Sequence, residues 1–214
     1  MAQYLRLALA LSSVHSDSPL HDSSTCNVTL LQGCYDTYLE NFNVTTNPAP
    51  SFVQYTGAKN EFIGEHGLSG QKEICQWQHN LEKCLGQSIS SCITREAIQE
   101  AFNVSSTDAL LYEFDFDADQ YQCGDGYEDL LKYFYCYQYV EKERMEQFMA
   151  CGKKFDDAMQ KGGFKCSYLY DFISCTGSVF TQECGPGISK FICNTQEAVY
   201  KPILHQCDGS WPKC

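Results

Sequence analysis

The segment SGQKEICQWQHNLEKCLG, residues 69–86, decides the fold class. Its apolar residues Ile74, Trp77, Leu81 and Leu85 recur at intervals of three or four, which is the period of an α-helix with one buried face. The serine that opens the segment is a favoured N-cap, and the glycine that closes it can end a helix. The segment is therefore predicted to be an amphipathic helix.

This predicted helix carries two cysteines, Cys75 and Cys84, nine residues apart. Nine residues turn an α-helix through about 900°, so the two sulfur atoms leave it on opposite sides. A helix of this kind can be joined by disulfides to two different neighbours. We therefore expect a layer of helices that are cross-linked to one another.

Weaker helical patterns extend over most of the chain. They predict helices at residues 28–42, 94–102, 108–114, 126–160, 166–181 and 195–205, the last bent or divided by Pro202. The longest pattern is interrupted by polar Gln138 and Glu141, so it fits either one helix or two helices meeting near Lys142. Loops are expected at residues 43–51 and 115–126. The predicted fold class is mostly α, a disulfide-stapled helical bundle.

The chain has 14 cysteines, an even number, and no C-x-x-C pair. This spacing argues against zinc sites, iron–sulfur clusters and thioredoxin-like redox pairs. We predict no cofactor and seven structural disulfides, whose pairing the sequence leaves open. The cysteines are Cys26, Cys34, Cys75, Cys84, Cys92, Cys123, Cys136, Cys151, Cys166, Cys175, Cys184, Cys193, Cys207 and Cys214.

The cysteine spacing also suggests two related units. The pattern C-x8-C-x7-C that begins at Cys75 has a counterpart, C-x8-C-x8-C, that begins at Cys166, and a Cys-Tyr pair precedes each of them. This pattern predicts a first cysteine-rich helical unit at residues 17–114 and a second at residues 115–214. An internal duplication would explain the pattern. Chance combined with a shared helical period would also explain it, in which case the chain is one continuous domain.

The first 16 residues have the features of a short secretory signal peptide: one basic residue, a short apolar run and a small residue at the end. The alternative is an amphipathic N-terminal helix of the mature protein. No other stretch reaches the roughly 18 apolar residues needed to cross a bilayer. Three N-glycosylation sequons begin at Asn27, Asn43 and Asn103. We therefore expect a secreted, extracellular glycoprotein with no membrane span.

The formal charge of −12 gives the chain no means of holding a nucleic-acid backbone or an anionic membrane surface. Motifs of catalysis are also absent from the sequence, which has no G-x-S-x-G, no H-E-x-x-H and no glycine-rich phosphate loop. Its histidines lie far apart. We expect a protein that is not an enzyme and does not bind nucleic acid.

An acidic run begins like a calcium-binding loop. Asp115, Asp117 and Asp119 occupy the alternating positions that such a loop needs, but its sixth position is Gln120 rather than glycine and its twelfth is Gly126 rather than glutamate. A true EF-hand is therefore not expected. Two interpretations stay open, a weak calcium site at the three aspartates and a solvated acidic loop.

Several cysteine and aromatic motifs occur in a fixed order along the chain. They are Cys34-Tyr35, Ile74-Cys75-x8-Cys84, Phe134-Tyr135-Cys136, Cys151-x14-Cys166 and Phe172-Ile173-x-Cys175-x8-Cys184-Gly185. In this order the chain resembles the cysteine-rich extracellular helical domains of nematodes and other invertebrates called domain of unknown function nineteen. It is more distantly similar to invertebrate haemolymph glycoproteins. The resemblance spans most of residues 26–207 and implies a secreted, disulfide-stapled helical protein without a defining catalytic residue.

Four alternating tyrosines, Tyr133, Tyr135, Tyr137 and Tyr139, lie on one predicted helix and point to different faces. At least one or two of them should be exposed, where tyrosine favours protein recognition. We therefore expect an interaction module whose partner is another extracellular protein. Two alternatives are a carrier of a small hydrophobic ligand, lined by Phe, Tyr and Met, and an acidic, calcium- or mineral-associated extracellular matrix protein.

Overall fold

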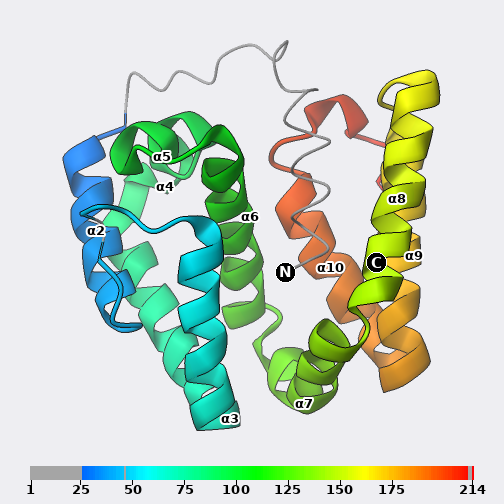
Figure 1. The fold of residues 1–214 in the computed structure, drawn as a ribbon, viewed down its shortest axis with the longest axis horizontal. Helices are drawn as coiled ribbons and strands as arrows, with labels where there is room; N and C mark the ends of the chain where they lie inside the picture. Colours follow the sequence, from blue (N-terminus) through cyan, green and yellow to red (C-terminus); the bar gives the residue numbers. More distant parts are fainter. Residues whose placement is uncertain (1–25, 46, 212–213) are drawn as a thin grey trace. The chain divides into compact units, whose positions relative to one another are not determined.

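The computed structural model describes residues 26–45, 47–211 and 214 (Figure 1). These residues form helices joined by turns and loops, and no strand occurs among them. The predicted fold class, a mostly α bundle stapled by disulfides, is confirmed. The expected signal peptide at residues 1–16 lies outside the described residues. None of the helices in the described ranges is long and apolar enough to cross a bilayer.

Two compact units make up the described chain, and the division falls between Cys123 and Gly124. We call residues 26–123 the first unit and residues 124–214 the second unit. The first unit contains α2 (Val28–Glu40), α3 (Phe52–Leu85), η3 (Gly86–Ser88), α4 (Ile89–Cys92), α5 (Arg95–Phe102) and α6 (Ser106–Cys123). The second contains α7 (Tyr127–Glu143), α8 (Met145–Gly162), α9 (Cys166–Cys184), η4 (Pro186–Ile188), α10 (Ser189–Tyr200) and η5 (His205–Cys207).

The division lies beyond the boundary expected after residue 114. That position falls inside α6, which is continuous to Cys123. The last residue of α6 is also tied to α3 by the disulfide between Cys75 and Cys123. The whole of α6 therefore packs with the first unit.

The predicted helix at residues 70–85 is the second part of the long helix α3. Its end is as predicted, because Gly86 follows it with a positive φ of 53°. Its start differs, because α3 begins with a capping box in which the Ser51 hydroxyl accepts a hydrogen bond from the Gln54 N–H. Ser69 lies inside the helix, two residues after a kink at Gly67 (φ 58°, ψ −138°). Of the two interpretations of residues 126–160, two helices is correct, and they meet at Arg144.

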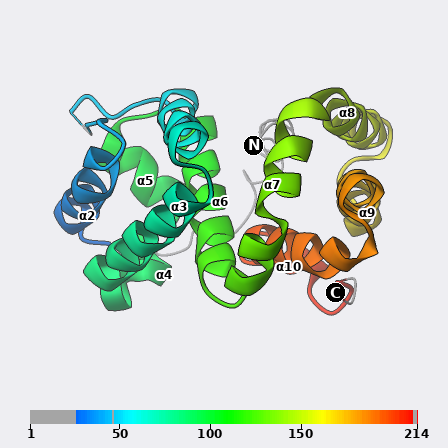
Figure 2. The same ribbon diagram turned by 90° about the horizontal axis from the view of Figure 1, so that it is seen from below.

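The first unit is a helical bundle in which α2 contacts α3 and α5, and α6 contacts the same two helices (Figure 2). Its core is aromatic. The Tyr55 and Tyr112 rings stack at 5.3 Å, and Tyr35 packs edge-on against Phe102 at 5.1 Å. Three disulfides staple this unit, Cys26–Cys92, Cys34–Cys84 and Cys75–Cys123.

The second unit is organised around α9, which contacts α7, α8 and α10. Its core includes Tyr137 of α7, which stacks on Phe180 of α9 with ring centres 5.2 Å apart. Four disulfides staple it, Cys136–Cys184, Cys151–Cys175, Cys166–Cys207 and Cys193–Cys214. All 14 cysteines are paired, as predicted, and each pair lies within one unit.

Disulfides leave the long helices toward different neighbours, as the nine-residue spacing predicts. On α3, Cys75 binds Cys123 of α6 and Cys84 binds Cys34 of α2. The three cysteines of α9 bind α7, α8 and η5 in the same manner. Each long helix is therefore fixed to its neighbours by covalent bonds as well as by packing.

Candidate functional site

The acidic segment of the first unit is helical. The loop expected at residues 115–126 is wrong for residues 115–123, which continue α6. The helix starts where the Ser105 hydroxyl accepts a hydrogen bond from the Asp108 N–H at 3.0 Å. Its apolar side chains Leu110 and Phe114 are buried and hold it against the bundle. The aspartates that follow are therefore carried into the interior.

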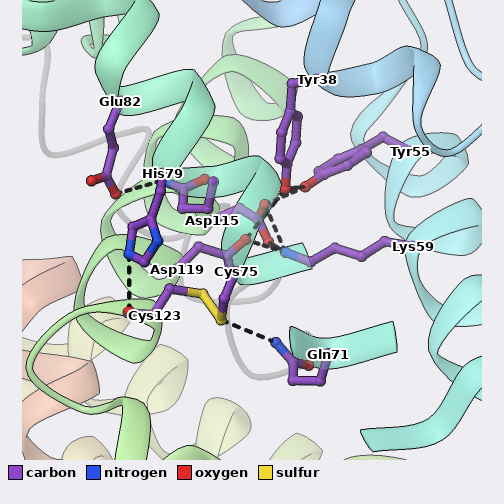
Figure 3. Close-up of a disulfide and its surroundings, with 11 residues drawn as sticks. Tyr38, Tyr55, Lys59, Gln71, Cys75, His79, Glu82, Asp115, Asp119 and Cys123 are labelled. Carbon is purple, nitrogen blue, oxygen red and sulfur yellow. Dashed lines mark hydrogen bonds and ion pairs between the residues drawn. A yellow bond between two sulfur atoms is a disulfide. The ribbon is translucent and has the colours of Figure 1, made fainter. Parts of the chain in front are cut away.

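Lys59 of α3 meets two of these aspartates (Figure 3). Its Nζ lies 3.1 Å from Asp115 Oδ1 and 2.5 Å from Asp119 Oδ2. Lys59 and Asp119 are 7% and 5% exposed, so water screens this ion pair poorly. Burial by itself lowers the pKa of Lys59, but the two carboxylates outweigh it and hold that pKa well above its ordinary value. Lys59 is therefore a permanent buried cation.

Two tyrosines extend this network toward α2. The Tyr55 hydroxyl donates a hydrogen bond to Asp115 Oδ2 at 2.7 Å, and the Tyr38 hydroxyl lies 3.0 Å from that of Tyr55. Burial raises the pKa of both tyrosines, so they stay neutral. Burial also raises the pKa of Asp119, against the opposing charge of Lys59. We call these five residues the Lys59 network; it links α2, α3 and α6 through polar contacts.

The weak calcium candidate does not form a calcium loop. Asp115 and Asp119 are engaged by Lys59, and Asp117 lies between them on the same helix. Oxygen ligands for calcium must converge on one point, which an α-helix cannot arrange with successive alternate residues. Among the residues that the structure describes, no group of three or more His, Cys, Asp or Glu is placed to hold a metal ion.

Glu113 and Asp117 are a second pair of carboxylates on α6, and among the described residues neither forms an ion pair with a lysine. Glu113 is 8% exposed. Burial, together with the charges of Asp117 and Glu96, raises the pKa of Glu113 to about 8, although the backbone N–H and the charge of Arg95 oppose this. Burial alone raises the pKa of Asp117 to about 7. Both groups therefore take up a proton near neutral pH.

Exposed aromatic residues occur in the second unit, on α7. Tyr135 is 71% exposed and Tyr139 is 45% exposed, whereas Tyr137 is buried. Tyr133 is half-buried under the Lys132 ammonium, which lies 4.7 Å from its ring centre. The expectation that one or two of the four tyrosines are exposed is confirmed. Because Tyr135 and Tyr139 are four residues apart, they lie on one face of the helix.

Arg144, at the junction of α7 and α8, fixes Tyr139. Its guanidinium lies 5.1 Å from the Tyr139 ring centre and donates a hydrogen bond to the Tyr139 hydroxyl at 2.9 Å. The same guanidinium donates to Glu183 of α9 at 2.6 Å. Met145 and Met149 follow on α8, 37% and 41% exposed. We call Tyr135, Tyr139, Met145 and Met149 the exposed aromatic–methionine set.

The three sequon asparagines are exposed and lie next to helix ends in the first unit. Asn27 is the N-cap of α2, and its Oδ1 accepts a hydrogen bond from the Leu30 N–H at 3.1 Å. Asn103 is the C-cap of α5 and has a positive φ of 52°. Asn43 follows α2 and has a positive φ of 56°.

The Lys59 network was not predicted from the sequence. Its signal was a lysine on an apolar helix face, because Lys59 stands four residues from both Tyr55 and Ile63, which are buried. Such a lysine requires buried carboxylates, and the aspartates of α6 were available in the sequence to supply them.

No protein-family model matches the chain, and neither a curated protein nor a solved structure matches it. The likeness to domain of unknown function nineteen therefore stays a resemblance in cysteine and aromatic spacing. Seven disulfides are typical of chains that fold in an oxidising compartment, outside the cytosol.

Proposed function

We propose that the protein is a secreted, disulfide-stapled module that binds another extracellular protein through α7 of its second unit. The observation that carries this proposal is the exposure of Tyr135 and Tyr139 on one helix face. Burying tyrosine yields a large contact area at a small cost in side-chain entropy, so exposed tyrosines are frequent centres of protein interfaces.

The contacts of Arg144 support the same proposal. They hold the Tyr139 ring in place before any partner arrives. A side chain that is already ordered loses less entropy on binding, which raises affinity. The flexible side chains of Met145 and Met149 can adapt to the surface of a partner. The set thus combines a fixed aromatic centre with adaptable neighbours.

A photo-reactive residue at position 135 tests the proposal. After irradiation in extracellular fluid from the source tissue, we expect one discrete adduct that is absent when the residue is placed at Glu61, an exposed site on α3. The adduct partner is then purified and titrated against the double variant Tyr135→Ser/Tyr139→Ser. We expect binding weaker by about 30-fold, the effect of losing one interface centre of about 2 kcal/mol.

The matched control for this titration is Val53→Ser on α3, because Val53 is 64% exposed and apolar as well. Its affinity should equal that of the unmodified protein. Equal binding by the double tyrosine variant would contradict the proposal, as would an adduct that forms from both positions. The carrier and matrix alternatives receive no specific support from a contact within the described ranges.

A further inference from the structure

The three sequons are distributed unevenly over the two units. All three lie between residues 26 and 123, and no N-x-S/T motif occurs between residues 124 and 214. Within the first unit Asn27 and Asn43 lie at the two ends of α2, and Asn103 lies at the end of α5, three residues before α6 begins. Helices α2 and α5 contact each other and appear side by side in Figure 1.

The local structure leaves each acceptor amide open. All three asparagines are exposed, and so are the hydroxyl residues of their sequons, Thr29, Thr45 and Ser105. Asn27 uses its Oδ1 as the helix cap, which leaves the Nδ2 amide for attachment. The positive φ of the other two asparagines places them in the left-handed region that ends helices.

We propose that Asn27, Asn43 and Asn103 each carry an N-linked glycan, so that carbohydrate is attached only at the ends of α2 and α5 and the second unit carries none. In this step the Nδ2 atom bonds to the anomeric carbon of a lipid-linked oligosaccharide. The lipid pyrophosphate leaves that carbon, and the amide loses one proton. This inference rests on the secretion of the protein proposed above, but it does not require that the protein has a binding partner.

Acidic and basic residues are also distributed unevenly over the two units. Residues 26–123 contain 13 Asp and Glu against four Lys and Arg, whereas residues 124–214 contain 12 against ten. The formal charges are therefore −9 and −2, and when the interior residues Lys59, Glu113, Asp115, Asp117 and Asp119 are left out the first unit still has nine acidic against three basic residues, a charge of −6. Acidic charge and carbohydrate both keep a surface hydrated and discourage association. Their concentration on the first unit leaves the second unit, with Tyr135 and Tyr139, as the one whose surface is free of attached sugar.

Substitution by aspartate tests this inference without disturbing the fold. Aspartate is as good an N-cap as asparagine and also tolerates the left-handed region, so Asn27→Asp, Asn43→Asp and Asn103→Asp keep each local structure. The full chain is secreted from eukaryotic cells behind an added leader, which makes the result independent of its own N-terminus. Intact masses are compared before and after treatment with a peptide N-glycosidase, which converts each glycosylated asparagine to aspartate.

We expect three converted asparagines in the unmodified protein, the loss of one glycan in each single variant and none left in the triple variant. Asn60→Asp, at an exposed asparagine of α3 outside any sequon, is the control and should keep all three glycans. Recovery of any one of the three sites only as unmodified asparagine would overturn the proposal. Carbohydrate that the N-glycosidase removes from the triple variant would overturn it too, because an asparagine outside these three sites would then be modified.

Discussion

Substitution of Glu113 by glutamine should stabilise the protein, and by an amount that depends on pH. The folded chain binds the Glu113 proton with a pKa of about 8, against an ordinary value of 4.5. Below pH 4.5 the carboxyl is protonated in both states and costs nothing. As the pH rises from 4.5 toward 8, the Glu113 carboxyl ionises in the unfolded chain, where water solvates it, but stays protonated in the folded chain. The free energy of unfolding therefore falls over this range.

The size of this loss of stability follows from the difference between the solution pH and the ordinary pKa of Glu113. At pH 7 the ordinary pKa lies about 2.5 units below the solution pH, and each unit corresponds to about 1.4 kcal/mol, so the loss is about 3 kcal/mol. Glutamine has no proton to lose, and its carbonyl oxygen can still accept the Arg95 N–H. Glu113→Gln should therefore be about 3 kcal/mol more stable than the unmodified protein at pH 7 and equal to it at pH 4.

Urea denaturation of the oxidised protein, followed by circular dichroism from pH 4 to pH 9, measures this difference. Glu61→Gln is the matched control, because Glu61 is exposed on α3 and its stability curve should follow that of the unmodified protein. If the curves of Glu113→Gln and the unmodified protein stay parallel over the whole range, the reasoning from burial is refuted.

Two further outcomes are expected. Lys59→Met should destabilise the first unit by about 3–5 kcal/mol in urea denaturation, because it leaves two buried carboxylates without a cation. Adding Asp115→Asn and Asp119→Asn should restore most of the lost stability. Lys72→Met, at an exposed lysine, is the control, and equal urea midpoints for the two lysine variants would count against the network. Reduction of the seven disulfides should abolish the helical circular-dichroism signal at room temperature, since each contributes about 2–4 kcal/mol, whereas an unchanged thermal melt would show that the helices do not depend on them.

The helices were largely predictable because their signals are local. Gly86 ends α3 as expected, since only a residue that tolerates a positive φ fits there. The break between α7 and α8 was also visible, because polar residues interrupt the apolar stripe near Lys142. The disulfide count followed from the number of cysteines and the lack of any closely spaced pair.

The continuation of α6 through the acidic residues was not predictable, because the cation that allows these residues to be buried is distant in the sequence. Asp115 and Asp119 look like loop residues until Lys59 is placed beside them, and Lys59 is 56 and 60 residues away. Local pattern reasoning treats a row of aspartates as solvated. The cation that allows them to be buried belongs to another helix, and only the packing of α3 on α6 reveals it.

The disulfide pairing also changes how the two units should be compared. The cysteine spacing aligns Cys84 with Cys175. In the structure, however, Cys84 of α3 binds Cys34 of α2, and the matching bond of the second unit joins Cys184 of α9 to Cys136 of α7. In both units the paired cysteine lies at the end of a long helix. A glycine with positive φ, a 3-10 turn and a further helix follow each of them. The equivalent cysteines are therefore Cys84 and Cys184, one cysteine later than the spacing suggested.

This alignment of the two units shows which side chains of α7 have a counterpart in α2 of the first unit and which do not. With Cys34 matched to Cys136, the exposed Tyr135 and Tyr139 of α7 correspond to Gly33 and Thr37 of α2, which are exposed as well. A glycine and a threonine satisfy the same helix positions in the first unit, so a helix in this place does not need large aromatic side chains there. Packing explains why Tyr137 is buried, and contacts with Phe134 and Arg144 position Tyr135 and Tyr139, but these contacts leave both rings exposed to solvent. The proposed binding role would use these two exposed rings, because tyrosine is enriched at the centres of protein interfaces.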